Sequence, residues 1–246
     1  MSRKISVCMA TYKGALFIKE QLESILVCLG TDDEVIISDD YSPDDTLAIA
    51  RSFDDPRIKI FMNEPKNKGH IGNFGNAMSK ATGDLIFLAD QDDVWHPERV
   101  STVSKALQEH ELVVCDCWVV DGKLNVINDS FYSIINAGSG LTKNWVKNTY
   151  LGCCMAFHKR IVEKALPFPK NIASHDNWMG LMGEIYGSTV FIPEKLHYFR
   201  RHGTNFSQND EGDAMSEQTS PYTFMQKMKI RWVLAIELLK RVIRNG

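Results

Sequence analysis

Three carboxylates stand within four positions in the segment LADQDDVW (88–95), directly after the apolar run DLIFLA. Carboxylates held this close repel one another strongly in a low dielectric unless a cation or protons compensate. Oxygen ligands of this kind suit Mg²⁺ or Mn²⁺, and these ions usually complete their shell with substrate phosphates. Asp90, Asp92 and Asp93 therefore predict a divalent metal site that faces a nucleoside diphosphate.

The chain before this cluster alternates between strand and helix patterns. Apolar and β-branched runs predict strands at 5–12, 34–38, 57–63 and 84–89. Helical spacing predicts helices at 15–29, at 45–53 after Asp44 or Asp45, and from about Asn73 up to Gly83. This alternation is typical of an α/β fold with a parallel sheet covered on both faces.

Polar residues end three of the four predicted strands. They are Thr11-Tyr12, Asp39-Asp40 and the cluster that begins at Asp90. In open parallel sheets, ligands bind at the carboxyl ends of the strands. We therefore expect these side chains to converge on one cleft.

The pattern changes after about residue 113. LVVCDCWVVDG predicts another strand or hairpin, and a less regular stretch covers 125–148. A strand after Gly152 and a helix that ends before Pro167 follow. SHDNWMGLMGEIYG predicts a helix with Ser174 as N-cap and Asp176 in its first turn. A first-turn Asp often only interacts favourably with the helix dipole.

Composition limits the classes of protein that remain. The 246 residues are 44% hydrophobic and 24% charged, which is enough to bury a sizeable core. The net charge of −3 gives no overall positive field for a nucleic-acid partner. No apolar run fits a signal peptide or reaches the roughly 18 residues of a spanning helix, so we expect a cytoplasmic protein.

The six cysteines include none at C-x-x-C spacing, and a cytoplasmic location argues against disulfides. We expect them to be buried thiols. They are Cys8, Cys28, Cys115, Cys117, Cys153 and Cys154.

At these motifs the chain resembles the family 2 glycosyltransferases, whose nucleotide-binding fold is called GT-A. The matching segments are SVCMATYKG, SDDYSPDDT, LADQDDVWHPERV, SHDNW and YFRRHGTNFS, in that order over residues 5 to about 207. Within the family, the chain looks most like bacterial enzymes that build O-antigen, capsule or cell-wall polysaccharides. These include rhamnosyltransferase-like members with a segment similar to GCCMAF.

The resemblance implies a GT-A domain over 1–207, with a mainly parallel central sheet and helices on both faces. Its nucleotide-binding half would cover about 1–97 and its acceptor-binding and catalytic half about 98–207. A linker at 208–221 and an amphipathic helix at 222–246 would follow. The implied activity is inverting transfer of a hexose or rhamnose from a UDP- or dTDP-sugar to a hydroxyl of a surface polysaccharide carried on polyprenyl diphosphate.

The resemblance also implies roles in nucleotide binding. Thr11 and Tyr12 would lie beside the base, and Asp40 would accept the imide N–H of uracil or thymine, which disfavours cytosine. The alternative is that Asp39 or Asp40 only caps the following turn. Asp90 would contact the ribose.

Asp92 would bind Mn²⁺ or Mg²⁺ in the family pattern, while Asp93 would support the metal shell or cap the turn before Pro97. His202 would be a second metal ligand. The alternative is that Arg200, Arg201 or His202 meets diphosphate oxygens.

Asp176 would be the catalytic base. The family usually has Glu-Asp at this point, and His175 replaces the Glu, which leaves the role of His175 open.

Other interpretations stay open. A sugar nucleotidyltransferase shares the α/β core but would need a Gly-rich phosphate loop where this chain has ATYKGA. A non-catalytic nucleotide-sugar binding protein would need no base. The C-terminal helix has six Lys or Arg and one Glu. It could pack against the body of the protein or dock on an anionic membrane, which would place the protein at the inner face of the cell membrane.

Overall fold

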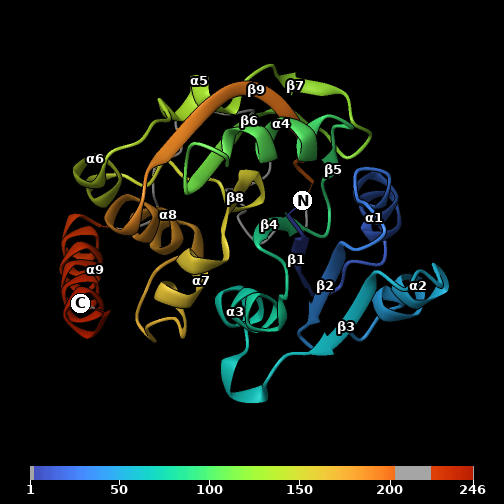
Figure 1. Cartoon of the computed structure of the whole chain (residues 1–246), viewed down its shortest axis with the longest axis horizontal. Helices are drawn as coiled ribbons and strands as arrows, with labels where there is room; N and C mark the ends of the chain where they lie inside the picture. The colour runs from blue at the N-terminus through green and yellow to red at the C-terminus, as the bar shows by residue number, and fades with distance from the viewer. Residues whose placement is uncertain (1–2, 203–222, 246) are drawn as a thin grey trace.

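The computed structural model describes residues 3–202 and 223–245. Within these residues, nine strands form one sheet in the order β3-β2-β1-β4-β8-β6-β9-β5, with β7 paired to β6 (Figure 1). The strands are β1 (Ile5–Thr11), β2 (Glu34–Asp39), β3 (Ile58–Met62), β4 (Leu85–Asp90), β5 (Val94–Trp95), β6 (Leu112–Val120), β7 (Val126–Asn128), β8 (Met155–His158) and β9 (Thr189–Arg200).

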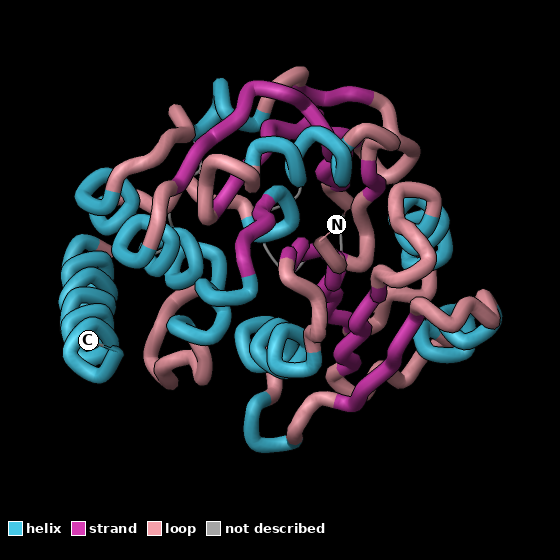
Figure 2. Tube along the Cα trace, viewed as in Figure 1, coloured by secondary structure: helices cyan, strands magenta, loops and turns pink. Residues whose placement is uncertain are grey.

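Helices surround this sheet (Figure 2). The α-helices are α1 (Ile18–Leu26), α2 (Thr46–Ser52), α3 (His70–Lys80), α4 (Arg99–Ala106), α5 (Phe131–Ile135), α6 (Leu141–Val146), α7 (Lys159–Ala165), α8 (His175–Tyr186) and α9 (Phe224–Asn245). Two short 3₁₀ turns, η1 (Pro65–Asn67) and η2 (Gly152–Cys154), complete the elements. The α/β class predicted from the sequence is confirmed.

The first four strands are parallel, as predicted. Strand β1 pairs with β2 and β4, so Thr11 lies opposite Asp39 and Ala10 lies opposite Asp90. Helices α1 and α2 lie on one side of β1–β3 and α3 lies on the other (Figure 1). The carboxyl ends of three strands therefore meet at one edge.

Helix α3 begins at His70, earlier than the predicted Asn73. Gly69, with φ at 97°, turns the chain directly before the helix in a conformation that other residues rarely adopt. No side-chain cap marks this start. The sequence signal for a helix N-terminus is therefore absent at the true position.

The second half of the sheet is mixed. Strand β8 is antiparallel to both β4 and β6, while β6 and β9 are parallel. The strand or hairpin predicted for LVVCDCWVVDG (112–122) is strand β6, which forms antiparallel pairs with β7. The division into two halves near residue 97 stays a prediction, because one sheet spans both sides of it.

Five of the six cysteines are buried and all six are free thiols. The prediction of burial is wrong for Cys28, which is only half-buried. It lies just beyond the end of α1, where its Sγ is 3.2 Å from the carbonyl oxygen of Ser24. A helix end at the protein surface leaves the thiol partly open to solvent.

The helix predicted at 222–246 is present as α9, and it packs on α6 and α7. Leu234, Leu238 and Arg241 are buried on its inner face. The guanidinium of Arg241 donates to the carbonyl oxygens of Leu166 at 2.8 Å and Pro167 at 2.6 Å. The predicted linker at 208–221 lies outside the described residues.

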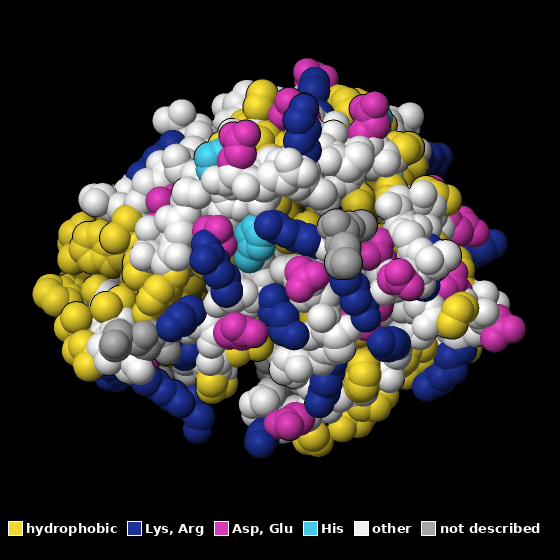
Figure 3. All heavy atoms as spheres, viewed as in Figure 1, with side chains coloured by type: hydrophobic (Ala, Val, Ile, Leu, Met, Phe, Trp, Pro, Cys, Tyr) yellow, Lys and Arg dark blue, Asp and Glu magenta, His cyan; other side chains and the backbone are white. Residues whose placement is uncertain are grey.

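No helix in 3–202 or 223–245 combines the length and the apolar character needed to cross a bilayer. Acidic and basic side chains are intermixed over the face seen in Figure 3, while hydrophobic side chains gather at its left edge near α6 and α9. The face shown therefore carries no broad field of one sign.

Candidate active site

Asp90 ends β4, and Asp92 and Asp93 follow it directly at the carboxyl edge of that strand. Burial raises the pKa of Asp90 well above its usual range, and the negative charges of Asp93, Asp92 and Asp176 raise it further. Asp176 comes from α8, in the other half of the chain. A buried carboxyl group with negative charges around it favours a compensating cation or a proton.

Asp92 and His202 are neighbours in space. Oδ2 of Asp92 lies 2.9 Å from Nε2 of His202, and the His202 ring packs against Phe17 with centroids 4.5 Å apart. A carboxylate oxygen and an imidazole nitrogen at one point are donors that suit Mn²⁺, while oxygen donors alone suit Mg²⁺. The two residues predicted as metal ligands are therefore brought together, and their donor atoms fit a divalent ion.

Asp93 is buried in a separate network. Its Oδ1 accepts from the backbone N–H of Arg200 at 2.8 Å, and its Oδ2 lies 2.7 Å from Nε2 of His197. Nη1 of Arg99 lies 2.8 Å from Nδ1 of the same imidazole. Because Arg only donates hydrogen bonds, Nδ1 of His197 must be the acceptor. Nε2 of His197 then carries the ring proton and donates a hydrogen bond to Asp93. Asp93 thus ties the loop after β4 to β9.

Two further groups of metal-ligating side chains occur among the described residues. Asp90, Asp93 and Cys153 form one, and Cys153, Cys154 and His197 form the other, each with ligand atoms within 4.8 Å of one another. Asp93 and His197 are fully buried, and burial raises the pKa of the Cys153 thiol well above its usual range. The side chains of Asp92 and His202 stay 16% and 13% exposed, so they are the more accessible candidates for metal ligands.

Arg200 was one alternative partner for diphosphate oxygens, and its side chain is buried. Its guanidinium donates to the carbonyl oxygens of Asp92 at 2.8 Å and Gly122 at 2.9 Å, and it forms an ion pair with Glu20. These contacts hold the loop that carries Asp92. Arg201 is half-buried, with its guanidinium 5.7 Å from the ring centroid of Phe199.

Asp39 and Asp40 have different environments. Asp39 is buried and accepts from Oγ1 of Thr11 at 2.7 Å and from the backbone N–H of Ser42 at 2.7 Å, so it caps the turn. Asp40 is half-buried and accepts from Nδ2 of Asn63 at 3.0 Å and the N–H of Gly69 at 2.8 Å. Asp40 is therefore the less buried of the two carboxylates.

Tyr12 is held by a residue that the sequence analysis did not single out. Its backbone N–H donates to Oε1 of Gln91 and its carbonyl oxygen accepts from Nε2 of Gln91, both at 2.9 Å. The Tyr12 side chain is 49% exposed at the edge of the sheet. Gly14 permits this pairing, since a Cβ there would lie 2.3 Å from Oε1 of Gln91. In the sequence, the Gln that stands inside the acidic segment could have pointed to this contact.

Asp176 stands in the first turn of α8, as predicted. Its Oδ1 accepts from the N–H of Asn177 at 2.6 Å and from Nδ2 of Asn148 at 3.4 Å. Asn148 lies in the irregular stretch before β8, where no sequence signal marked it. Burial lowers the pKa of His70, at the first position of α3, and the nearby charge of Asp176 opposes this effect.

His175 is buried and stacks on Phe74, with ring centroids 4.2 Å apart. Neither of its ring nitrogens has a hydrogen-bond partner among the described residues. Burial lowers the pKa of His175 to about 4, against the opposing effect of Asp176. The imidazole is therefore neutral at pH 7, unlike the Glu that it replaces in the family pattern.

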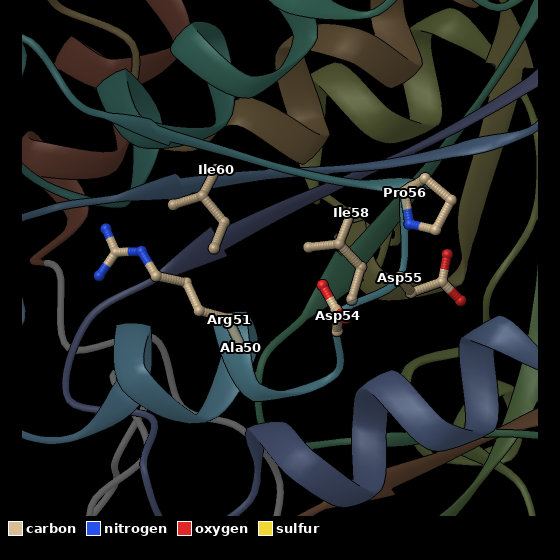
Figure 4. Close-up of a pocket in the computed structure, with 7 residues that line it drawn as sticks. All are labelled: Ala50, Arg51, Asp54, Asp55, Pro56, Ile58 and Ile60. Atoms are coloured by element: carbon tan, nitrogen blue, oxygen red, sulfur yellow. The ribbon is translucent and has the colours of Figure 1, made fainter.

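A cavity of about 400 Å³ lies elsewhere, between α2 and β3 (Figure 4). Its lining residues are Ala50, Arg51, Asp54, Asp55, Pro56, Ile58 and Ile60. Strand β3 is the edge strand, three positions from β4 in the sheet. This cavity is therefore separate from the carboxylate site.

The sequence matches the family described as Glycosyl transferase family 2 over residues 6–166. The chain belongs to this family. Both the carboxylates after β4 and the strand that ends at Thr11 fall inside the matched region, whereas Asp176 and His202 lie beyond it. Membership of this family argues against the alternative that the chain is a sugar nucleotidyltransferase.

Several curated proteins are similar. An uncharacterized glycosyltransferase of Nostoc is 24% identical over 87% of this chain and 70% of its own length. An Escherichia coli UDP-Glc:alpha-D-GlcNAc-diphosphoundecaprenol beta-1,3-glucosyltransferase is 27% identical over 67% of this chain and 64% of its own. A Shigella flexneri dTDP-rhamnosyl transferase is 34% identical over 40% and 36%. The chain thus spans only part of each relative.

Solved structures show the same fold, GT-A. S. aureus TarS in complex with UDP-GlcNAc has a TM-score of 0.69 at 18% identity, over 94% of this chain and 66% of that one. The Pyrobaculum calidifontis mannosyltransferase PcManGT, in complex with GDP-Man and Mn²⁺, has a TM-score of 0.62 at 21% identity, over 80% and 57%. The predicted GT-A architecture is confirmed.

Proposed function

We propose that this protein is an inverting, metal-dependent glycosyltransferase that moves a sugar from a UDP- or dTDP-sugar to a hydroxyl of a growing bacterial surface polysaccharide carried on a lipid. The observation that carries the proposal is the pairing of Asp92, after β4, with His202, after β9, at 2.9 Å, beside a carboxyl group, Asp90, on whose pKa the charge of Asp176 from α8 also acts. The E. coli and Shigella relatives, named for UDP-glucose and dTDP-rhamnose transfer, support these donors.

The nucleotide would lie across the carboxyl ends of β1, β2 and β4. Tyr12 would offer an exposed ring to the base, and Asp40 would accept the imide N–H of uracil or thymine. Asn63 and Gly69 hold the Asp40 carboxylate in place. Asp90 would meet the ribose.

Asp92 and His202 would hold the divalent ion, Mn²⁺ or Mg²⁺. When bound, such an ion stabilises the negative charge that develops on the departing diphosphate. The buried Asp93–His197–Arg99 network and the Arg200 side chain would hold the Asp92 loop at a fixed position. Pre-positioned charge of this kind lowers the reorganisation needed during the reaction.

Asp176 would accept the proton of the acceptor hydroxyl as that oxygen attacks the anomeric carbon. Attack must come from the face opposite the departing diphosphate, so one displacement inverts the anomeric configuration. Asn148 donates to the Asp176 carboxylate and would help to orient it. An α-linked hexose donor would give a β-glycoside, and a β-linked rhamnose donor an α-glycoside.

The test is to incubate the purified protein and Mn²⁺ with a panel of UDP-, dTDP- and GDP-sugars and a polyprenyl-diphosphate-linked sugar acceptor. We expect one UDP- or dTDP-sugar to give a glycosylated acceptor, whose anomeric coupling by NMR shows inversion. A retained configuration would remove Asp176 from its role as base. Donor binding without any product would favour the non-catalytic alternative.

A further inference from the structure

Helix α9 is fixed to the protein body by its inner face. Besides the Arg241 contacts, Nε1 of Trp145 donates to the carbonyl oxygen of Arg231 at 3.0 Å, and the Arg231 guanidinium donates to the carbonyl oxygen of Val146 at 2.7 Å. Leu234 and Leu238, which lie between Arg231 and Arg241 in the sequence, are buried on the same face of the helix. Helix α9 is therefore docked through one face, and its opposite face is exposed.

The opposite face carries five exposed hydrophobic side chains that we call the outer stripe. Their exposed fractions run from 47% to 75%. At about 100° per residue, their spacings of 7, 4, 3 and 4 positions place them within an arc of about 60°. The members of the outer stripe are Met225, Trp232, Ile236, Leu239 and Ile243.

Basic side chains border the outer stripe. Lys229, Lys240 and Arg244 are exposed along one side of it, and Lys227 lies on the other side of the helix. The single acid of α9, Glu237, is paired with Lys240 at 2.7 Å. The helix thus has six basic residues and one acidic residue in a chain whose net charge is −3.

The neighbouring helix α6 extends this surface. Leu141 and Val146 are 43% and 46% exposed, and Lys143 and Lys147 lie beside them. The hydrophobic patch at the left edge of Figure 3 is where α6 and α9 stand in Figure 1. Apolar side chains and cations therefore share one surface built from two helices.

We propose that the outer stripe docks α9 flat on an anionic phospholipid surface. An amphipathic helix with Trp and aliphatic residues on one face and cations beside them lies in the plane of the membrane interface, with its apolar face among the acyl chains and its cations at the phosphates. The bordering cations argue against a second copy of the chain, because a symmetric pairing of two such faces would bring like charges together. This proposal does not rest on sugar transfer.

The experiment is co-sedimentation of the full chain with extruded vesicles. We expect binding to vesicles of phosphatidylcholine with phosphatidylglycerol, weaker binding to phosphatidylcholine alone, and weakening by salt. The triple variant Trp232→Ser, Ile236→Ser, Leu239→Ser should lose about tenfold or more in affinity. The variant Leu16→Ser, Val27→Ser is the matched control, because those side chains are 84% and 77% exposed on the far side of the protein.

The triple variant changes only outward side chains, so its circular dichroism and its transfer rate to a short water-soluble acceptor should match the wild type. Either of two results would overturn the proposal: wild-type protein that fails to bind anionic vesicles, or a triple variant that binds them as tightly as the wild type. A wild-type dimer in light scattering that the triple variant abolishes would assign the outer stripe to a second copy instead. Vesicle binding without sugar transfer would leave this proposal standing and count against the proposed function.

Discussion

Oδ2 of Asp92 lies 2.9 Å from Nε2 of His202, although 110 positions separate the two residues in the chain. The first follows β4 and the second follows β9, so the fold of the whole sheet is needed to make the pair. If the pair binds the proposed metal, one carboxylate and one imidazole would leave other coordination positions for water and phosphate oxygens.

Removal of the metal should abolish transfer. We expect no activity in excess EDTA and recovery on addition of Mn²⁺, because the diphosphate would lack its compensating charge. Asp92→Ala should raise the Mn²⁺ concentration needed for half-maximal activity by about tenfold to a hundredfold. His202→Ala should change it in the same direction. Asp32→Ala, at an exposed acid, is the control. Full activity in EDTA would contradict the assignment.

Asp176→Asn should separate binding from chemistry. The amide keeps the shape of the carboxylate but cannot take a proton, so turnover should fall by about 10² or more. Donor affinity, measured by calorimetry with the nucleotide sugar, should stay within about twofold of the wild type. Unchanged turnover would mean that another group is the base.

Gly14→Ala should act through Gln91. The added Cβ would lie 2.3 Å from Oε1 of Gln91, so that side chain must leave the Tyr12 backbone. We expect Gly14→Ala and Gln91→Ala each to raise the KM for the donor by about threefold to tenfold. The double variant should be no worse than either single one, since both remove the same contact. Additive losses would show that Gly14 matters for another reason.

His197→Phe should destabilise the fold. It removes the donor to the buried Asp93 carboxylate and the acceptor for Arg99, which together should cost about 3 kcal/mol in the free energy of unfolding. Urea denaturation measures this loss. His96→Phe, at a half-buried histidine, should cost less than about 1 kcal/mol. Equal losses for the two variants would mean that the network contributes little.

Glu34 predicts how stability depends on pH. Burial opposes its ionisation, but hydrogen bonds from Lys59, Ser6 and Thr82 outweigh burial and lower the pKa of Glu34 to about 2. The unfolded chain, with an ordinary pKa of about 4.3, binds the proton more readily. The stabilisation, up to about 3 kcal/mol, is therefore fully present above about pH 4.3 and is lost as the pH falls toward 2.

Unfolding by urea at pH 6 and at pH 3 measures this contribution. In Glu34→Gln, the slope of stability against pH in this window should be shallower than in the wild type. Identical slopes would show that Glu34 does not carry the effect. Glu64→Gln, at an exposed glutamate paired with Lys66, is a suitable control.

The fold of the first part of the chain, up to β4, was largely predictable because its signals are local. Strands β1, β2 and β4 are apolar runs followed by polar residues, and parallel pairing then places Thr11, Asp39 and Asp90 at one edge. The different roles of Asp39 and Asp40 were not predictable. They depend on Ser42 and Asn63, whose contacts arise only once the loops have folded.

The second half depends on contacts between residues far apart in the chain. The antiparallel position of β8 between β4 and β6 has no local signal. Arg200 looked like a cation for the diphosphate, yet its partners include Glu20, 180 positions away. His175 could be located in the family pattern, but its burial against Phe74 could not be foreseen from spacing.

The ladder from β4 through β8 to β6 has a mechanical consequence. Leu85 is paired with His158 in the β4–β8 ladder, and Leu112 is paired with Phe157 in the β8–β6 ladder, so the two halves of the enzyme cannot swing apart without breaking strand pairing. Adjustment around a donor must come from side chains and connections at the carboxyl edge. The spacing between the proposed metal ligands at the carboxyl edge and the proposed base on α8 is therefore set when the chain folds, before any substrate arrives.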